Sequence, residues 1–346
     1  MSDFPRSPEE LSTDWLTKAL GHEVNAFAVE YFSEGTGVIG QVIRINLETG
    51  VGPTSVIAKF PSPVVDNRAV AEAYDMYGRE VQFYRDIAPI LTLRTPRCHF
   101  AAFEPSTNNF VLLLEDLADL RIGDQVTGCS LAEAQAVVDT LADMHASVWQ
   151  PTDLGVSSHN SAMQRDGMIG GFRLGWPVVA AEFGDLIPAS AQNVGDAMPN
   201  AIGNLLDTMC TDPVCFTHAD VRLDNIFFGD GEVVFVDWQS ICTSAPEQDL
   251  AYFLTQSVPP DVRAQEDLIA RYHGALSAQG ITYDLDRCRE RYRVCALYLL
   301  CYAVVIAGTL DMGNERGKTL ARTLLGNSLS ALDEMNAFDL LENVRK

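Results

Sequence analysis

The chain has 346 residues, 47% of them hydrophobic and 9% aromatic, and its formal net charge is −23. This length is too great for one small core and suits two lobes, and the apolar fraction is that of a globular protein. Such an acidic surface repels phosphate backbones and anionic membranes, so we expect neither nucleic acid nor a membrane as a partner. A plainer interpretation is that the charge only aids solubility.

The eight cysteines follow no framework, and no C-x-x-C pair occurs. Isolated thiols at irregular spacing are typical of a reducing cytoplasm rather than of a disulfide scaffold or a zinc site. The N-terminus shows no signal-peptide pattern, so we expect a cytoplasmic protein. The uncharged run 294–310 falls just short of a membrane span, and we interpret it as a buried helix.

Residues 1–115 predict a small α+β lobe. Ser7, Pro8 and Glu10 are typical of a helix start, and this helix should stop near Gly21. Runs rich in β-branched and aromatic residues predict five strands, with one main helix at Val70–Ile87 between the third and the fourth. The expected strands are Val24–Glu34, Val38–Leu47, Ser55–Phe60, Cys98–Phe103 and Phe110–Leu114.

Residues 116–346 predict a larger and mainly helical lobe. Ser130 and Glu133 form a capping-box pattern that opens a helix reaching about Trp149. From Ala201 onward the chain is mostly helical, and short apolar runs at 214–217, 226–228 and 233–236 interrupt it. The sequence therefore predicts an N-terminal nucleotide-binding lobe at 1–115 and a C-terminal catalytic and acceptor-binding lobe at 116–346.

The segment from His218 to Asp237 carries the strongest chemical signal. Asp220 and Asn225 lie five residues apart between short apolar runs, and Asp237 follows twelve residues after Asn225. This pattern fits a phosphoryl-transfer site, in which one carboxylate accepts the proton of the attacking hydroxyl. An amide oxygen and a second carboxylate then hold Mg²⁺ on the phosphates. A lone His-x-Asp would suggest only a turn with a buried histidine. Asp220, Asn225 and Asp237 supply three roles of the phosphoryl-transfer site in chain order, so the turn is the weaker interpretation.

The same residues resemble the catalytic loop of the protein-kinase-like superfamily. The closest pattern is that of the aminoglycoside phosphotransferase and choline-kinase group with its ecdysteroid-kinase-like relatives. Ala219 stands where this group usually has glycine. The resemblance covers about residues 30–260 and implies a bilobal α+β fold with ATP and Mg²⁺ as cofactors.

Upstream residues supply further parts of the kinase pattern. Gly35, Thr36 and Gly37 lie between two predicted strands and match a glycine-rich loop over the nucleotide phosphates, although a plain hairpin has the same appearance. By resemblance, Lys59 on the third strand binds the α and β phosphates. Glu80 is its expected ion-pair partner, and Glu72 is the alternative.

The resemblance implies roles for a few other residues. The backbone of Glu115 and Leu117 would pair with the adenine edge, and Asp249 would brace the catalytic loop. His145 is expected to pack a helix rather than to catalyse. Arg222 would approach the transferred phosphate, or it would only form a salt bridge with Asp224 or another neighbour.

These observations predict a kinase that acts on a hydroxyl of a small molecule. Ala245-Pro246-Glu247 matches a protein-kinase landmark but begins only eight residues after Asp237, too close for a peptide-binding activation segment. A protein kinase is therefore the weaker alternative. A regulatory pseudokinase would be expected to lack one of the key residues, and a metal-dependent hydrolase would need a second histidine cluster.

The sequence leaves two chemical classes of acceptor open, and either ATP or GTP could be the phosphoryl donor. Residues 1–115 hold nine Lys and Arg against 15 Asp and Glu, so the remaining residues carry 17 of the 23 net negative charges. That charge would attract cations such as amino sugars. A Met- and aromatic-rich stretch favours an apolar or amphipathic hydroxyl compound instead. Its residues are Met163, Met168, Ile169, Phe172, Leu174, Trp176, Val178, Val179, Phe183, Leu186, Ile187 and Met198.

Overall fold

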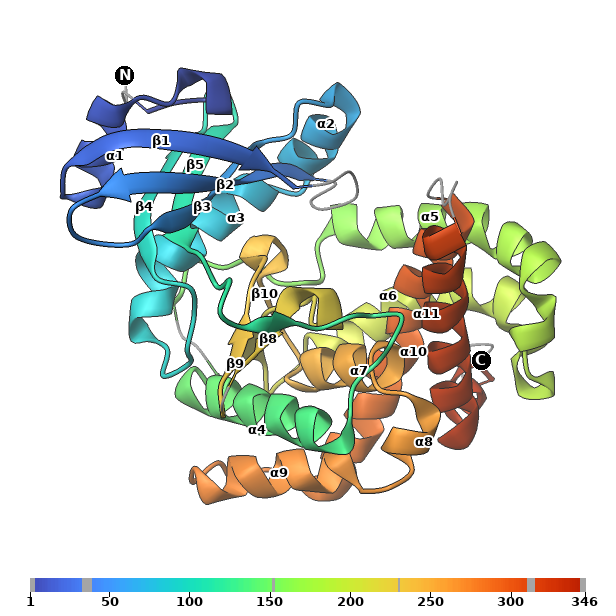
Figure 1. Cartoon of the computed structure of the whole chain (residues 1–346). Coiled ribbons are helices and arrows are strands. Elements are labelled where there is room, and N and C mark those ends of the chain that lie inside the picture. The colour runs from blue at the N-terminus through green and yellow to red at the C-terminus, as the bar shows by residue number, and fades with distance from the viewer. Residues whose placement is uncertain (1–3, 33–38, 151–152, 230, 310–314, 343–346) are drawn as a thin grey trace. The chain divides into compact units, whose positions relative to one another are not determined.

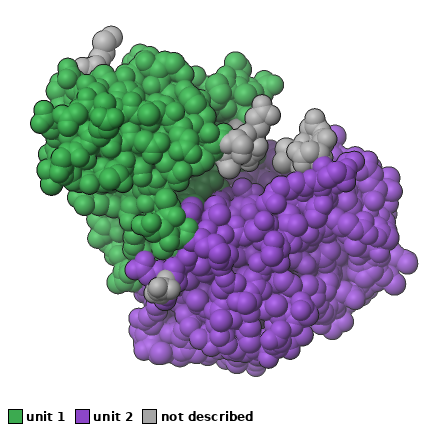
Figure 2. All heavy atoms as spheres, in the orientation of Figure 1, with its two compact units in different colours: residues 1–120, 234–241 green, residues 121–233, 242–346 purple. Residues whose placement is uncertain are grey.

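The structure is a computed structural model that describes residues 4–32, 39–150, 153–229, 231–309 and 315–342. Two compact units are present, residues 1–120 with 234–241 and residues 121–233 with 242–346 (Figure 2). The segment 234–241 contains Asp237 and belongs to the unit that the N-terminal residues build. The two lobes predicted from the sequence stay a prediction.

The first unit contains the five predicted strands in one antiparallel sheet, in the order β1-β2-β3-β5-β4 (Figure 1). This arrangement confirms the predicted α+β fold class. β3 lies at the centre and pairs with β2 on one side and β5 on the other. The strands are β1 (Val24–Tyr31), β2 (Gly40–Thr49), β3 (Ser55–Pro61), β4 (Cys98–Glu104) and β5 (Asn109–Glu115).

The predicted start of the first helix is wrong. Pro8–Glu10 forms only a 3₁₀ turn, and α1 (Thr13–Leu20) begins after Ser12, whose side chain accepts the N–H of Trp15 at 3.2 Å. The cap residue is therefore Ser12, because only its hydroxyl satisfies a free N–H of the first turn. The expected stop is confirmed: Gly21 ends α1 in the left-handed conformation that glycine adopts without strain.

The structure has three helical segments where the sequence predicted a single helix at Val70–Ile87. α2 (Val65–Ala73) begins earlier, α3 (Met76–Gln82) follows, and a π-helical turn occupies Phe83–Ile87. Asp75 separates α2 from α3 with a φ of 51°, a conformation that breaks helical hydrogen bonding. α3 and its π turn carry Glu80 and the buried aromatic residues that pack beside it.

The second unit is mainly helical, as predicted. Its helices are α4 (Leu131–Ser147), α5 (Ala162–Glu182), α6 (Val194–Met209), α7 (Glu247–Gln256), α8 (Pro260–Arg263), α9 (Leu268–Ala278), α10 (Leu285–Thr309) and α11 (Glu315–Glu334). The capping box of Ser130 and Glu133 is confirmed at the start of α4. Short strand pairs lie among the helices, β6 (Arg121–Ile122) with β8 (Ile226–Phe228) and β7 (Cys215–Thr217) with β10 (Cys242–Ser244); β9 (Val233–Phe235) follows β8 in the chain.

α10 is the central helix of the second unit. It packs on α5, α6, α7 and α11, and 13 of its residues are buried. Among the described residues it is the one helix long and apolar enough to span a membrane, and 61% of that apolar stretch is buried inside the unit. The prediction of a buried core helix is therefore confirmed.

Candidate active site

Strand alternation directs Lys59 toward α3. Val56, Ala58 and Phe60 are fully buried in the core on the α1 side of the sheet. Because successive side chains of a strand point to opposite faces, Lys59 projects from the other face, where α3 packs on β4 and β5. The sequence thus places the amine on the face of the sheet that α3 covers.

Lys59, Glu80 and Asp237 form a compact charged group, called here the Lys59 cluster. The Lys59 Nζ donates to Glu80 Oε1 at 2.6 Å and to Asp237 Oδ1 at 2.8 Å. Glu80 rather than Glu72 therefore meets Lys59, because Glu72 lies exposed on α2. The side chains of Lys59 and Glu80 are 11% and 2% exposed, whereas that of Asp237 is 23% exposed.

The cluster keeps the lysine charged in spite of its burial. Burial alone would lower the pKa of Lys59, but the Asp237 and Glu80 carboxylates outweigh it and hold this pKa above its ordinary value. A permanent buried cation between carboxylates is suited to binding anionic phosphate oxygens.

The backbone around Asp237 fixes its carboxylate. Asp237 has a φ of 67°, a left-handed conformation that aspartate tolerates better than most residues. The next residue, Trp238, stacks on Phe83 with ring centroids 3.8 Å apart and an interplanar angle of 7°. Gln239 Nε2 donates to Asp237 Oδ2 at 3.2 Å. The segment that bears Asp237 is thereby anchored to the π turn that follows Glu80 in the chain.

The loop His218–Asn225 of the second unit brings three predicted residues together. Asn225 Nδ2 donates to the carbonyl oxygen and to the Oδ2 of Asp220, both at 3.0 Å. Arg222 Nε lies 3.9 Å from Asp220 Oδ1. Among the ion pairs of the described residues, Arg222 therefore pairs with Asp220 and not with Asp224. The side chain of Asp220 is 18% exposed.

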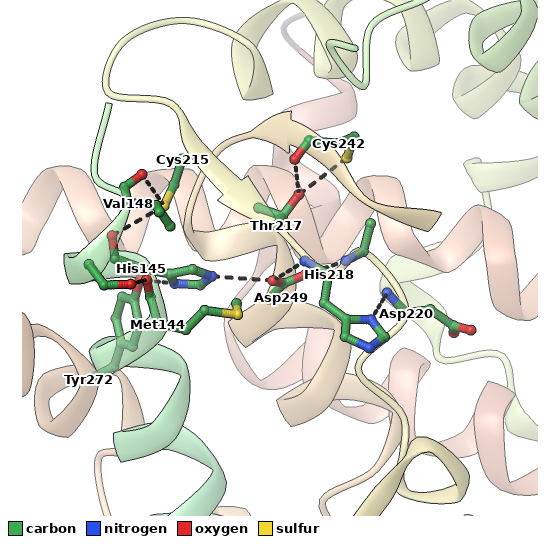
Figure 3. Close-up of polar contacts among 12 residues, drawn as sticks. Met144, His145, Val148, Cys215, Thr217, His218, Asp220, Cys242, Asp249 and Tyr272 are labelled. Carbon is green, nitrogen blue, oxygen red and sulfur yellow. Dashed lines mark hydrogen bonds and ion pairs between the residues drawn. The ribbon is translucent and has the colours of Figure 1, made fainter. Parts of the chain in front are cut away.

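The carboxylate of Asp249 binds the backbone of this loop, as the resemblance implied. Its Oδ2 accepts the N–H of His218 at 2.8 Å and its Oδ1 accepts the N–H of Ala219 at 2.7 Å (Figure 3). His145 lies on the other side of the carboxylate, with its Nε2 3.2 Å from Asp249 Oδ2 and its Nδ1 2.7 Å from the Tyr272 hydroxyl. The prediction that His145 packs a helix rather than catalyses fits this fully buried position.

One residue that supports the loop was missed from the sequence. Gln125 Oε1 accepts the N–H of Leu223 at 2.9 Å, although the two residues lie 98 positions apart. No local pattern indicates Gln125.

The expected nucleotide-edge residues lie at the end of β5 and just after it, and their backbone contacts with the adenine edge stay a prediction. Glu115 ends β5, and its carboxylate binds the Arg94 guanidinium at 2.7 and 2.9 Å. Leu117 is buried and its carbonyl accepts the N–H of Leu120 at 2.9 Å. Gly35, Thr36 and Gly37 lie outside the described residues, so their assignment stays a prediction.

The residues proposed for Mg²⁺ have the right donor chemistry. Asn225 uses its amide nitrogen on Asp220, which leaves its carbonyl oxygen as the atom that can bind a cation. Asp237 offers carboxylate oxygens and stays partly exposed. Within the described ranges no three His, Cys, Asp or Glu side chains gather into a metal cage. Oxygen donors with few protein ligands fit Mg²⁺, which is bound mainly together with phosphates and waters.

Comparison with known protein families shows the family of the chain. Residues 37–290 match the APH phosphotransferase enzyme family, and the chain belongs to this family. It is therefore a phosphotransferase enzyme of the protein-kinase-like superfamily. No curated protein matches the chain.

Several solved structures share the fold. The gentamicin complex of APH(2'')-IIa is 13% identical with a TM-score of 0.55, covering 94% of this chain and 99% of that one. The GDP complex of aminoglycoside 2'-phosphotransferase-IIIa is 13% identical with a TM-score of 0.51, covering 93% and 99%. ADP-bound APH(2'')-Ib is 13% identical with a TM-score of 0.50, covering 91% and 98%. At such low identity these likenesses show the fold alone.

Proposed function

We propose that this phosphotransferase is a small-molecule kinase that transfers the γ-phosphoryl group of ATP to a hydroxyl. The Lys59 cluster carries the proposal, because a buried, charged amine held by two carboxylates is the arrangement with which kinases bind nucleotide phosphates. The similar structures that contain ADP or GDP support a nucleotide as the phosphoryl donor.

In the proposed reaction Asp220 is the base. As the acceptor oxygen bonds to the γ-phosphorus and ADP leaves, the hydroxyl proton passes to the Asp220 carboxylate. Arg222, 3.9 Å from that carboxylate, would stabilise charge on the transferred group. Asn225 and Asp237 would hold Mg²⁺ together with the phosphates, and the ion would supply charge neutralisation there. Asp220 acts chiefly by aligning the hydroxyl, because the transition state is loose.

The short connection after Asp237 supports a small acceptor rather than a peptide. Residues 237–247 are all described, and they form the turn at Trp238–Ser240, then β10, then the start of α7. β10 pairs with β7 of the second unit, so this connection contains a strand that is already part of a sheet and is not a free platform. A protein substrate needs such a platform beside the catalytic loop.

An ATP-consumption assay over a panel of small alcohols, with mass detection of the product, tests the proposal. Asp220→Asn should lower turnover by about a hundredfold or more while ATP still raises the melting temperature. Asp224→Asn in the same loop is the matched control, because an asparagine oxygen can still accept the N–H of Gln125. Near-normal turnover in Asp220→Asn would remove this residue from the mechanism.

A further inference from the structure

Residues 121–125 run along the end of the catalytic loop and are called here the strap. The first two of them form β6, which pairs with β8, the strand that begins directly after Asn225. The Gly123 N–H then donates to the carbonyl oxygen of Ile226 at 2.8 Å. A Cβ on Gly123 would lie 2.5 Å from the carbonyl oxygen of Leu223, so glycine lets the strap lie this close to the turn that carries Asn225.

The side-chain amide of Gln125 bonds to the catalytic loop and to the end of α7 at once. Its Oε1 accepts the N–H of Leu223 at 2.9 Å and the hydroxyl of Ser257 at 3.0 Å. Its Nε2 donates to the carbonyl oxygen of Gln256, the last residue of α7, at 2.6 Å. Gln125 is only 1% exposed, so water cannot replace any of these bonds. The amide therefore fixes Leu223 against the end of α7.

The turn that presents Gln125 is fixed by its own backbone contacts. Asp124 Oδ1 accepts the N–H of Val126 at 2.8 Å and that of Thr127 at 3.2 Å. The Gly128 N–H donates to the carbonyl oxygen of Asp124 at 2.9 Å, and Gly128 has a φ of 77°, which glycine adopts without strain. None of these bonds involves the side chain of Gln125. A substitution of that side chain should therefore leave the turn intact.

α7 thereby holds the catalytic loop near both of its ends. Asp249 on α7 binds the two backbone N–H groups that precede Asp220 (Figure 3). Gln125 carries the hold of the same helix to the first N–H of the 3₁₀ turn Leu223–Asn225. Between these two points lie the proposed base, Asp220, and the proposed metal ligand, Asn225, joined by a hydrogen bond of 3.0 Å. One helix thus sets the position of both.

We propose that Gln125 is a positioning residue that places the metal ligand Asn225 relative to the base Asp220. The inference rests on the proposed function, in which these two side chains serve one reaction. Asn225 uses its amide nitrogen on Asp220, so its backbone position decides where its carbonyl oxygen points. Without the Gln125 amide, the turn would lose its anchor at Leu223 and this oxygen would move off the metal position. Errors of about 1 Å in position are costly to rate.

Gln125→Met tests the inference, because methionine is also long and unbranched but has no amide. We expect kcat to fall roughly tenfold, and the Mg²⁺ concentration for half-maximal activity to rise by a similar factor, as for one lost hydrogen bond that positions a catalytic group. Gln256→Met is the matched control, since its side chain is also buried but donates to the carbonyl oxygen of Leu299 on α10 at 3.1 Å. Both quantities should stay within about threefold in this control. Equal losses in the two variants would mean a general loosening of the unit and would rule out the positioning role.

A gentler variant keeps the test decisive if Gln125→Met does not fold. In Gln125→Asn the amide is one methylene shorter, so it can reach Leu223 or Gln256 but not both. The fall in kcat and the rise in the Mg²⁺ requirement should then be about threefold, for part of the same hydrogen-bonding. Wild-type values of both in Gln125→Asn would contradict the inference.

Amide hydrogen exchange separates this inference from the proposed function, because it requires no turnover. In Gln125→Met the amides of Leu223 and Asn225 should exchange at least about tenfold faster, while that of Ala219, held by Asp249, should keep its rate. If the wild type phosphorylates no alcohol but both amides lose protection in Gln125→Met, the proposed function fails and the placing of Asn225 by Gln125 stands. An unchanged exchange rate at Asn225, or an unchanged kcat and Mg²⁺ requirement where the wild type is active, would overturn it.

Discussion

Asp249 holds Ala219 in a conformation that alanine avoids. The Ala219 N–H donates to Asp249 Oδ1 at 2.7 Å, and the backbone of Ala219 has a φ of 63°. A left-handed conformation costs a residue with a Cβ about 1–2 kcal/mol. The loop therefore carries strain at Ala219, and the two hydrogen bonds to the buried carboxylate of Asp249 offset it.

Ala219→Gly should relieve this strain. Glycine loses more chain entropy on folding, roughly 0.5–1 kcal/mol, so the net gain in unfolding free energy should be about 0–1.5 kcal/mol. Ala251→Gly is the control, because Ala251 is buried inside α7 and glycine there should lower stability by about 1 kcal/mol. Urea unfolding measures both. Equal losses in the two variants would show that Ala219 is not strained.

Local sequence patterns predicted most of the first unit. Runs rich in β-branched and aromatic residues predicted the five strands, because this signal lies within short windows. The short spacing from Asp220 to Asn225 likewise predicted a loop in which the structure brings these two side chains together. The break at Asp75 was missed because one left-handed residue interrupts a pattern that otherwise fits a longer helix. Gln125 was missed because its partner Leu223 lies 98 positions later in the chain, and only tertiary packing joins them.

A buried arginine should dominate the stability of the second unit. Arg291 donates to the carbonyl oxygens of Pro213 at 2.8 Å and of Met209 and Thr211 at 3.2 Å. Its Nε also lies 3.5 Å from the fully buried carboxylate of Glu247. Arg291→Met would leave a buried acid and these carbonyls without their donor, so we expect the unfolding free energy to fall by about 3–5 kcal/mol.

The same helix provides the control for that prediction. Arg287 lies one turn earlier on α10, is exposed, and donates to the carbonyl of Asp212. Arg287→Met should change stability by at most about 0.5 kcal/mol, as is usual for surface positions. Thermal or urea unfolding of both variants gives the comparison. Similar losses for the two arginines would contradict the special role of the buried one.

Lys59→Met should weaken both nucleotide binding and turnover. The substitution removes the cation that Glu80 and Asp237 share, and it leaves the two carboxylates without their common partner. Calorimetric titration with ATP measures the affinity, and Lys18→Met, at an exposed position on α1, is the control. Unchanged ATP affinity together with unchanged turnover would show that Lys59 does not bind the nucleotide phosphates.

Asp237→Ala should abolish the Mg²⁺ dependence of nucleotide binding. One oxygen ligand of a hard cation is lost, while Lys59 keeps Glu80 as a partner. The measurement is the rise in melting temperature caused by ATP, with Mg²⁺ and with a chelator. Asp86→Ala removes an exposed carboxylate of the same unit and should leave the difference intact. A wild-type response to Mg·ATP in Asp237→Ala would show that the metal assignment is wrong.

The acceptor should be an apolar or amphipathic hydroxyl compound rather than a polycation. The negative charge of residues 116–346 favours cations, but net charge acts mostly through solvated surface groups. Side chains act at short range, and α5 exposes apolar residues: Met163 is 47% exposed and Leu174 is 72% exposed. Large apolar side chains on a surface helix suit contact with an apolar molecule.

Salt distinguishes the two kinds of acceptor. At about 0.15 M ionic strength charges are screened over roughly 8 Å, so binding of an amino sugar should weaken as salt rises further, whereas binding of an uncharged alcohol should not. We expect turnover of hydrophobic alcohols, nearly independent of salt, when they are compared with choline and aminoglycosides at low and high ionic strength. Leu174→Glu should raise KM for such an alcohol and leave KM for ATP unchanged. Efficient and strongly salt-sensitive phosphorylation of an amino sugar, with no turnover of any apolar alcohol, would reverse the expected acceptor class and leave the kinase assignment standing.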